Sequence, residues 1–352
     1  MTSVQLFDLD LAGLQSLFER MGERPFRAGQ VMQWVYKRGV LDIDRMTDLA
    51  RPLRAELARR ASLRLPAVEQ DLRSRDGTRK LLLRLADGER VETVLIPDEE
   101  RLTQCVSSQV GCAMGCAFCR TGTMGLVRHL TAGEIVSQVV LARQLLGPER
   151  RVTNVVFMGM GEPLHNLDNV VRAFRILSDD HGLNITRRRL TVSTCGLVDA
   201  MRRLPAEVLP SLAVSLNATT DAVRDRIMPV NRRYPIAVLL EALKELPLPP
   251  RARHTIEYVL LGGVNDSPED ARRLVRLLSG VRCKVNLIAY NPHESSPFRA
   301  PTPEAVAAFQ SQLLEKNFTA VLRKSRGQDI LAACGQLKAA AEAGTAPGPA
   351  RP

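Results

Sequence analysis

The sequence is poor in aromatic residues and contains no long apolar run. Phenylalanine, tryptophan and tyrosine together make up 4% of the 352 residues, so aliphatic side chains must form most of the core. No apolar stretch reaches the roughly 18 residues of a membrane-spanning helix, so no membrane association is expected. The acidic segment 1–10 lacks the basic and apolar parts of a signal peptide, which predicts a cytoplasmic protein.

A disulfide framework is also missing, although cysteine itself is not. The chain has seven cysteines, an odd number, and four of them fall between Cys105 and Cys119. Secreted domains that are stapled by disulfides are shorter and spread their cysteines more evenly. Clustered thiols in a reducing compartment instead favour metal binding or redox chemistry.

Negative charge is in deficit. Lysine and arginine number 49 against 38 aspartates and glutamates, which gives a formal net charge of +11. Such an excess favours a polyanionic partner, most often a nucleic acid. The alternative is a general preference for arginine that is unrelated to any partner, and charge alone leaves both interpretations open.

The apolar patterns predict an α/β protein with a barrel-like parallel sheet. Residues 1–65 read as helical, with Gly39 as a C-cap. Residues 79–97 fit a β-hairpin around an Asp-Gly turn. From residue 105 onward, aliphatic runs alternate with amphipathic stretches, and functional residues of such folds gather at the carboxyl ends of the strands. The expected strands are 105–111, 153–159, 189–194, 211–217, 254–261 and 284–290. Thr131 and Glu134 fit a capping box at the start of the first amphipathic stretch.

These patterns divide the chain into four segments. We expect an N-terminal helical RNA-binding accessory domain (1–65), a linker with the hairpin (66–104), a barrel that ends in a cysteine-containing segment (105–340), and a disordered Ala/Gly/Pro-rich tail (341–352). RNA binding by the first segment is suggested by Trp34, which lies among basic residues on one helix. A small helical core around the tryptophan explains the same pattern equally well.

Cys112, Cys116 and Cys119 follow the first expected strand of the barrel with the spacing C-x3-C-x2-C. A structural zinc site needs four closed ligands, usually from two C-x2-C pairs, whereas this loop has one such pair and no histidine. A [4Fe–4S] cluster takes one thiolate per iron, so three cysteines leave one iron open to an outside ligand. The missing fourth cysteine therefore favours a cluster that binds a methionine-derived cofactor through its amino and carboxylate groups.

This cysteine pattern resembles the radical S-adenosylmethionine (SAM) superfamily, in which an aromatic residue such as Phe118 typically precedes the last ligand. The run GMGEP at 159–163 is similar to the glycine-rich element that meets the amino group of SAM. Over roughly residues 15–340, ordered motifs resemble the RlmN family of dual-specificity RNA methyltransferases. They read PFRAGQVMQWVY, RVETVLIP, CVSSQVGCAMGCAFC, GMGEPLHN, STCGLV, AVSLNA, NLIAYNP and RKSRGQDILAACGQL.

The resemblance implies a reaction and its cofactors. Members of the family methylate C2 of adenine, in the peptidyl-transferase loop of 23S rRNA and in tRNA at the adenosine 3′ to the anticodon. That carbon lies between two ring nitrogens and is too electron-poor to attack the methyl group of SAM, so a carbon radical must add to it. A [4Fe–4S] cluster with one SAM on its open iron would generate a 5′-deoxyadenosyl radical. An electron donor such as a flavodoxin or ferredoxin system would supply the electron, and we expect the enzyme to be a monomer.

The resemblance also assigns roles to the cysteines. Cys112, Cys116 and Cys119 would hold the cluster. Cys334 would take a methyl group from a second SAM and carry it as S-methylcysteine. The methylene radical formed from that group would add to C2 and give a protein–RNA thioether. Cys105 would then attack the Cys334 sulfur, release the methylated base and leave a disulfide.

The position of Cys105 raises a geometric problem. A strand over 105–111 would place it a full strand length from Cys112, at about 3.3 Å per residue. Cys105 would then need Cys334 delivered on a mobile C-terminal loop, unless the strand is short.

Glu92 would be the base that removes the C2 proton. From the residues alone, it is a carboxylate that shares a hairpin face with Val94 and Ile96, and a solvated edge position is the simpler interpretation. The resemblance reverses that preference. It also implies SAM contacts, which fall on Gly161, Glu162, Ser193, Ser215, Leu216, Asn217 and Asn291.

Several residues have no family role or depart from the family pattern. Asn217 stands where relatives often have histidine, which is harmless if the SAM contact runs through the backbone. Cys195 and Cys283 fit small buried thiols, and His165 and His293 fit a hydrogen-bonding scaffold. Basic groups that could line an RNA channel, or simply be solvated, are 186–189, Arg232, Arg233 and 323–326.

Two rival functions stay open at this stage. A Cfr-like enzyme would modify adenine C8 with the same machinery, and motifs do not display the pocket geometry that selects the position. A non-enzymatic RNA-binding protein with a structural metal would explain the charge and the clustered thiols. It would not explain Cys334 in its ACGQL context or the GMGEP run.

Overall fold

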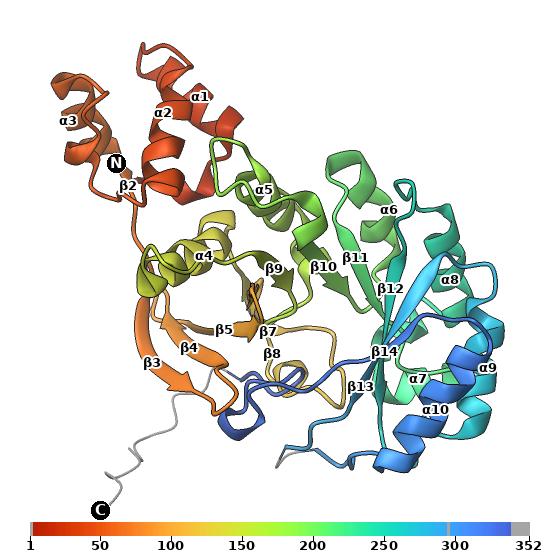
Figure 1. Cartoon of the computed structure of the whole chain (residues 1–352). Coiled ribbons are helices and arrows are strands. Elements are labelled where there is room, and N and C mark those ends of the chain that lie inside the picture. The colour runs from red at the N-terminus through yellow and green to blue at the C-terminus, as the bar shows by residue number, and fades with distance from the viewer. Residues whose placement is uncertain (1–2, 294–295, 339–352) are drawn as a thin grey trace, which may run out of the picture.

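The computed structural model describes residues 3–293 and 296–338, and the predicted tail 341–352 lies outside these ranges. One open ten-stranded sheet runs through the molecule in the order β14-β13-β12-β11-β10-β9-β6-β5-β4-β3 (Figure 1). Neighbours from β14 to β6 are parallel, and β5, β4 and β3 extend the sheet antiparallel. This confirms the predicted α/β class with a partial barrel. The strands are β3 (Ala67–Arg73), β4 (Arg79–Arg84), β5 (Arg90–Asp98), β6 (Arg101–Cys105), β9 (Asn154–Phe157), β10 (Leu190–Thr194), β11 (Ser211–Ser215), β12 (His254–Leu260), β13 (Cys283–Ala289) and β14 (Ala320–Leu322).

Helices connect the parallel strands and lie along the outer side of the sheet (Figure 1). The predicted capping box of the first is confirmed, because the Thr131 hydroxyl accepts from the Glu134 N–H and the Glu134 carboxylate accepts from the Thr131 N–H. Within the described ranges, none of the helices combines the length and apolar character needed to cross a bilayer. The helices are α4 (Ala132–Leu146), α5 (Leu167–Ser178), α6 (Val198–Glu207), α7 (Asp221–Ile227), α8 (Ile236–Glu245), α9 (Pro268–Leu278) and α10 (Pro303–Glu315).

The first predicted strand of the barrel, 105–111, is wrong. β6 ends at Cys105, and β7 (Gln109–Cys112) leaves the main sheet to pair with β8 (Gly125–His129). The chain leaves the sheet at Ser107, whose backbone N–H donates to the Gln138 side chain at 2.9 Å and not to a neighbouring strand. The Ser107 hydroxyl donates to the Glu92 carbonyl at 2.6 Å. Cys105 therefore lies at the carboxyl end of a short strand.

The hairpin predicted over 79–97 is confirmed as β4 and β5. The N-terminal region is helical as predicted, and Gly39 follows its central helices with a φ of 70°. It packs against the start of α4, where the Asp8 carboxylate accepts from the Gly133 N–H at 2.6 Å. Its elements are β1 (Val4–Gln5), α1 (Leu11–Arg20), α2 (Arg27–Met32), a π-helical turn (Gln33–Lys37), α3 (Arg51–Arg60) and β2 (Ala61–Ser62), with β1 and β2 paired.

Trp34 lies in the π-helical turn and is half-buried against the main core. Its indole N–H donates to the Asp48 carboxylate, and the Arg38 guanidinium lies 4.0 Å above its ring. These contacts match the interpretation of Trp34 as part of a small helical core, because its ring and N–H both have partners inside the chain.

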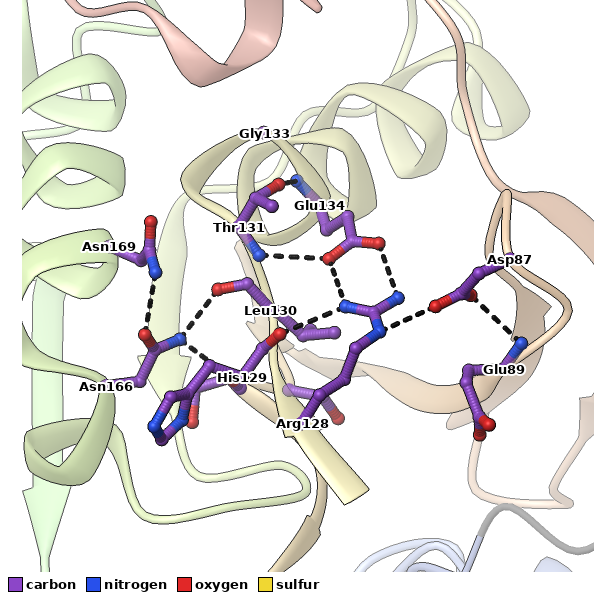
Figure 2. A network of polar contacts seen from close by, with 12 residues as sticks. Asp87, Glu89, Arg128, His129, Leu130, Thr131, Gly133, Glu134, Asn166 and Asn169 are labelled. Carbon is purple, nitrogen blue, oxygen red and sulfur yellow. Dashed lines mark hydrogen bonds and ion pairs between the residues drawn. The ribbon is translucent and has the colours of Figure 1, made fainter. Parts of the chain in front are cut away.

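Arg128 connects β8 to the tip of the hairpin and to the start of α4 (Figure 2). Its guanidinium donates two bonds of 2.8 Å to the Glu134 carboxylate and one of 2.6 Å to Asp87, in the turn between β4 and β5. The hydrogen bond from Arg128 lowers the pKa of Asp87. The hairpin tip, β8 and the start of α4 are thereby fixed relative to one another.

Candidate active site

A cavity opens at the carboxyl edge of the parallel strands. The residues of the main sheet that line it come from β9 to β13, most of them near the carboxyl ends of the strands, as a barrel-type site requires. Cys112, which ends β7, and loop residues complete the lining, among them Cys116, Cys119 and Cys334. The lining residues from the main sheet are Phe157, Ser193, Thr194, Ser215, Glu257, Val259, Ile288 and Ala289.

Tight turns shape residues 111–122, which carry Cys112, Cys116 and Cys119 and which we call the cysteine loop. Gly111 and Gly115 have φ of 74° and 63°, in the left-handed region that glycine adopts without strain. The Cys119 N–H donates to the Cys116 carbonyl at 3.0 Å. A Cβ on Gly122 would lie 2.8 Å from that same carbonyl oxygen, so the loop closes only around a glycine.

The three thiols lie in a water-poor setting. Burial raises the pKa of Cys112 to about 12 and raises the pKa of Cys116 and Cys119 as well. Such thiols become thiolates when a positively charged centre binds them. Among residues 3–293 and 296–338, no three His, Cys, Asp or Glu side chains converge closely enough to hold a single metal ion. In an iron–sulfur cluster each thiolate binds a different iron, so its sulfurs need not converge on one point.

The GMGEP run bends sharply into the cavity. A Cβ on Gly159 would lie 2.7 Å from the Ser107 hydroxyl oxygen and from the carbonyl of Val106. Glu162, directly after the bend, lines the cavity with a buried carboxylate that accepts from the N–H groups of Leu164 at 3.0 Å and Cys195 at 2.8 Å. Burial raises the pKa of Glu162.

Gly161→Ala is expected to abolish SAM binding and to lower the free energy of unfolding by about 1–3 kcal/mol. Gly161 has a φ of 102°, and an added Cβ would lie 2.6 Å from the Gln109 Cβ. Calorimetric titration with SAM and denaturant unfolding measure the two effects. Gly88→Ala is the matched control. At the Gly88 φ of 91° an alanine would be strained to a similar degree, but no atom lies within 4 Å of the added methyl group. Equal SAM affinity in both variants would contradict the packing argument.

Of the seven SAM contacts that the resemblance implies, Leu216 alone does not line the cavity; the structure brings the other six to its wall. Leu216 is buried in the main core, and its N–H donates to the Glu257 carbonyl at 3.0 Å. At Asn217, where relatives often have histidine, the side-chain oxygen accepts from the Val259 N–H at 2.8 Å. Its amide thus joins the end of β11 to β12. The six lining residues are Gly161, Glu162, Ser193, Ser215, Asn217 and Asn291.

Residues 327–338, which we call the Cys334 segment, lie over the cavity beside the cysteine loop. The Arg120 N–H donates to the Gly335 carbonyl at 2.8 Å, and the Thr121 hydroxyl donates to the Leu337 carbonyl at 2.6 Å. The Gln328 amide donates to the Asn291 side-chain oxygen at 2.6 Å, so this segment also touches a predicted SAM contact. The Cys334 thiol itself is exposed.

Cys105 and Cys334 line one smaller cavity, together with Cys119 and Arg323. The predicted obstacle to their meeting, a long strand between Cys105 and the cysteine loop, is therefore absent from the described fold. Burial raises the pKa of Cys105 to about 12. The two thiols that the resemblance pairs are brought to one place from opposite ends of the barrel sequence.

Glu92 is a buried residue of β5, so the interpretation as a solvated edge carboxylate is wrong. Its Oε1 lies 2.9 Å from the Lys80 ammonium, and its Oε2 accepts from the Lys338 N–H at 2.8 Å. It contacts the Cys334 segment and is not part of the lining of either cavity.

Sequence reasoning missed one charged residue of the site, Glu257, and gave another, Arg323, a different role. Glu257 lines the main cavity, accepts from the Ser193 hydroxyl at 3.2 Å and pairs with Arg323 at 3.3 Å. Arg323 was interpreted as a channel-lining or solvated charge, but it is half-buried beside the thiols. A lone carboxylate inside the apolar run HTIEYVLL was the available signal for Glu257.

The remaining candidates are placed as follows. Cys195 and Cys283 are buried as predicted, although Cys195 also lines the main cavity. His165 fits its scaffold role, because its ring contacts the Gln109 amide at 3.3 Å, and the same amide group accepts from the Glu162 N–H. The basic run 186–189 is exposed at the amino end of β10, on the edge opposite to the cavity, so it does not line a channel into the site.

Comparison with known proteins identifies the family. Residues 4–63 match the ribosomal RNA large subunit methyltransferase N-terminal domain, and residues 106–275 match the radical SAM superfamily. The dual-specificity RNA methyltransferase RlmN of Geobacter sulfurreducens is 54% identical over 337 residues, which cover 96% of this chain and 92% of that protein. The RlmN of Syntrophotalea carbinolica is 54% identical over 338 residues, covering 96% of this chain and 90% of the relative.

A solved structure agrees with this result. The crystal structure of a radical SAM methyltransferase from Sphaerobacter thermophilus superposes with a TM-score of 0.90 at 46% identity, covering 96% of this chain and 100% of that one. A [4Fe–4S] cluster and SAM are the cofactors of this superfamily, and the three cysteines at the cavity suit the cluster. The chain therefore belongs to the RlmN family of radical SAM RNA methyltransferases.

Proposed function

We propose that this chain methylates C2 of adenosine in the peptidyl-transferase loop of 23S rRNA and, in tRNA, at the adenosine 3′ to the anticodon. The observation that carries the proposal is the shared cavity of Cys105 and Cys334 beside Cys119. A methyl carrier and a thiol that resolves its adduct must reach one another, and both must lie near the radical source.

Each thiol has a separate task in this proposal. Cys112, Cys116 and Cys119 hold the cluster, which together with SAM supplies a radical able to remove hydrogen from a methyl group. The Cys334 thiolate takes a methyl group from SAM and presents it as S-methylcysteine. After hydrogen removal, its methylene carbon bonds to C2 and forms the thioether.

Glu92 and Cys105 complete the reaction and release the methylated base. Addition to C2 leaves one unpaired electron on the adduct, and the cluster, when bound, would take that electron back. Glu92 takes the proton from C2. The Cys105 thiolate attacks the Cys334 sulfur, so that a sulfur–sulfur bond forms while the sulfur–carbon bond breaks. The electron pair of the broken bond goes to the methylene carbon, which is protonated to a methyl group. The disulfide then needs two electrons before the next turnover. We propose a flavodoxin or ferredoxin system as the electron donor of the enzyme.

The remaining proposals concern partners and organisation. RNA is the macromolecular partner, in keeping with the net charge of +11 and the N-terminal match to a ribosomal RNA methyltransferase domain. Residues 1–65 form the RNA-binding accessory domain, 66–104 the linker with the hairpin, and 105–340 the barrel. The protein acts as a monomer in the cytoplasm.

Nucleoside mass spectrometry of RNA tests the proposal. Cells that lack this protein should contain no 2-methyladenosine at these sites, and cells that express it should contain the nucleoside in separately purified 23S rRNA and tRNA. Cys283→Ser, which alters a buried thiol at the amino end of β13, is the matched control and should methylate normally. The appearance of 8-methyladenosine would favour the C8 rival, and unmodified RNA would favour the non-enzymatic one.

A further inference from the structure

Lys80 and Glu92 form a buried ion pair that the assigned roles do not explain. They lie on neighbouring strands of the hairpin, two register positions apart on the same face, since Lys80 pairs with Val94 and Leu82 pairs with Glu92. Lys80 is 8% exposed, Glu92 is 4% exposed, and the charged atoms are 2.9 Å apart. A buried pair of charges stabilises a fold only when further hydrogen bonds satisfy both groups.

Those further bonds go to the Cys334 segment. The Lys80 ammonium donates to the Leu331 carbonyl at 3.3 Å, and the second oxygen of Glu92 accepts from the Lys338 N–H at 2.8 Å. Leu331 precedes Cys334 by three residues and Lys338 follows it by four. One ion pair thus holds the chain on both sides of the thiol.

The contact with Lys80 also falls on a strained residue. Leu331 has a φ of 51°, a conformation that a leucine adopts only when its surroundings impose it. In this conformation its carbonyl meets the ammonium group. The turn between β3 and β4 adds three bonds at the start of the segment. The Gly327 N–H donates to Asp76 at 2.9 Å, and Asp329 accepts from the Ser74 hydroxyl at 2.6 Å and from the Arg75 N–H at 3.2 Å. The strands β4 and β5 and the turn between β3 and β4 therefore hold the Cys334 segment in place.

We propose that Lys80 is a positioning residue that, through Glu92, latches the Cys334 segment over the cavity. This inference rests on the proposed function for the roles of Cys334 and Glu92. Because the Glu92 oxygens are engaged by Lys80 and by the Lys338 N–H, the carboxylate can approach adenine only after the Lys338 bond opens. Glu92 is thus both the group that holds the segment at Lys338 and the proton acceptor. When RNA binds, the bond between Glu92 and the Lys338 N–H opens and frees the carboxyl-terminal side of the segment.

Hydrogen–deuterium exchange tests the latch without relying on activity. In Lys80→Met, the amides of residues 331–338 should exchange about tenfold faster or more, as loss of a charge-assisted hydrogen bond predicts. Peptides of β10 to β12 should exchange as in the unaltered protein. Lys80→Arg, which keeps the charge, should restore most of the protection. Lys324→Met, at an exposed lysine just before the segment, is the matched control and should leave the exchange of residues 331–338 unchanged.

A second variant separates the latch from the stability of the hairpin. Lys338→Pro removes the N–H that Glu92 accepts and leaves β4 and β5 untouched. It should speed exchange in residues 331–337, and RNA bound to the unaltered holoenzyme should do the same at Lys338.

Unchanged exchange of the segment in both Lys80→Met and Lys338→Pro would overturn the inference. If exchange rises as expected but the unaltered enzyme produces no methylated adenosine, the latch stands and the proposed function fails. RNA methylation should also fall about tenfold or more in Lys80→Met and recover in Lys80→Arg, a rescue that simple loss of the fold would not show.

Discussion

Replacing Cys112, Cys116 or Cys119 by alanine, one at a time, is expected to abolish both iron–sulfur absorbance and RNA methylation. In the proposed assignment each thiolate binds a different iron, so the loss of one leaves two irons without a protein ligand. Cys195 and Cys334 line the same cavity, but they belong to other parts of the chain, Cys195 directly after β10 and Cys334 in the Cys334 segment. Neither lies within the loop that would have to wrap the cluster.

The fold should survive these substitutions. Removing one sulfur atom from the cavity wall should lower the free energy of unfolding by about 1 kcal/mol, a common size for a point substitution. Visible spectra after anaerobic reconstitution, iron content and circular dichroism separate cluster loss from unfolding. Cys283→Ala is the control and should keep full absorbance. A Cys116→Ala protein that keeps the charge-transfer bands and methylates RNA would overturn the ligand assignment.

Cys105→Ala is expected to trap RNA covalently on the protein. In the proposed mechanism, radical addition from Cys334 makes a thioether that water does not hydrolyse, so a thiol must attack its sulfur. Cys105 is the thiol that lines the smaller cavity with Cys334 and is not assigned to the cluster. It is buried, with 8% exposure, at the carboxyl end of β6.

A denaturing gel of Cys105→Ala protein expressed in cells measures the trapped species. A slowly migrating band should appear and collapse on nuclease digestion. The double variant Cys105→Ala, Cys334→Ala should lack the band, because no carrier remains to form the thioether. Free Cys105→Ala protein that methylates RNA at the normal rate would mean that another group resolves the intermediate.

The parts of the fold that depend on local sequence could be predicted. Aliphatic runs marked the five strands from β9 to β13, and the Thr131–Glu134 capping box marked the start of α4. β3 was missed because all of its residues are exposed and show no apolar alternation, and β14 has only three residues. The end of β6 was misplaced because Ser107 bonds to Gln138 and Glu92, two residues that no local pattern connects to it.

The candidate site divides in the same way. The cysteine loop and the GMGEP run are short motifs, so they were visible in the sequence, and the structure places both at the cavity. One partner of Arg323 and one of Lys80 were not predicted because they lie far along the chain. Lys80 bonds to a carbonyl 251 positions away, and Arg323 pairs with a carboxylate 66 positions away. A charge in a basic protein looks solvated until its partner is known.

The central claim is that the methyl group reaches adenine by way of Cys334 and not directly from SAM. Cells that express the protein can be fed methionine with a fully deuterated methyl group, and 2-methyladenosine from their RNA can be weighed. Cys334 first receives a methyl group with three deuterium atoms, one of which is removed when its carbon becomes reactive. Release from the thioether then adds a proton to the same carbon. The account therefore predicts 2-methyladenosine that carries two deuterium atoms in its methyl group, whereas a methyl group that retains all three would contradict it.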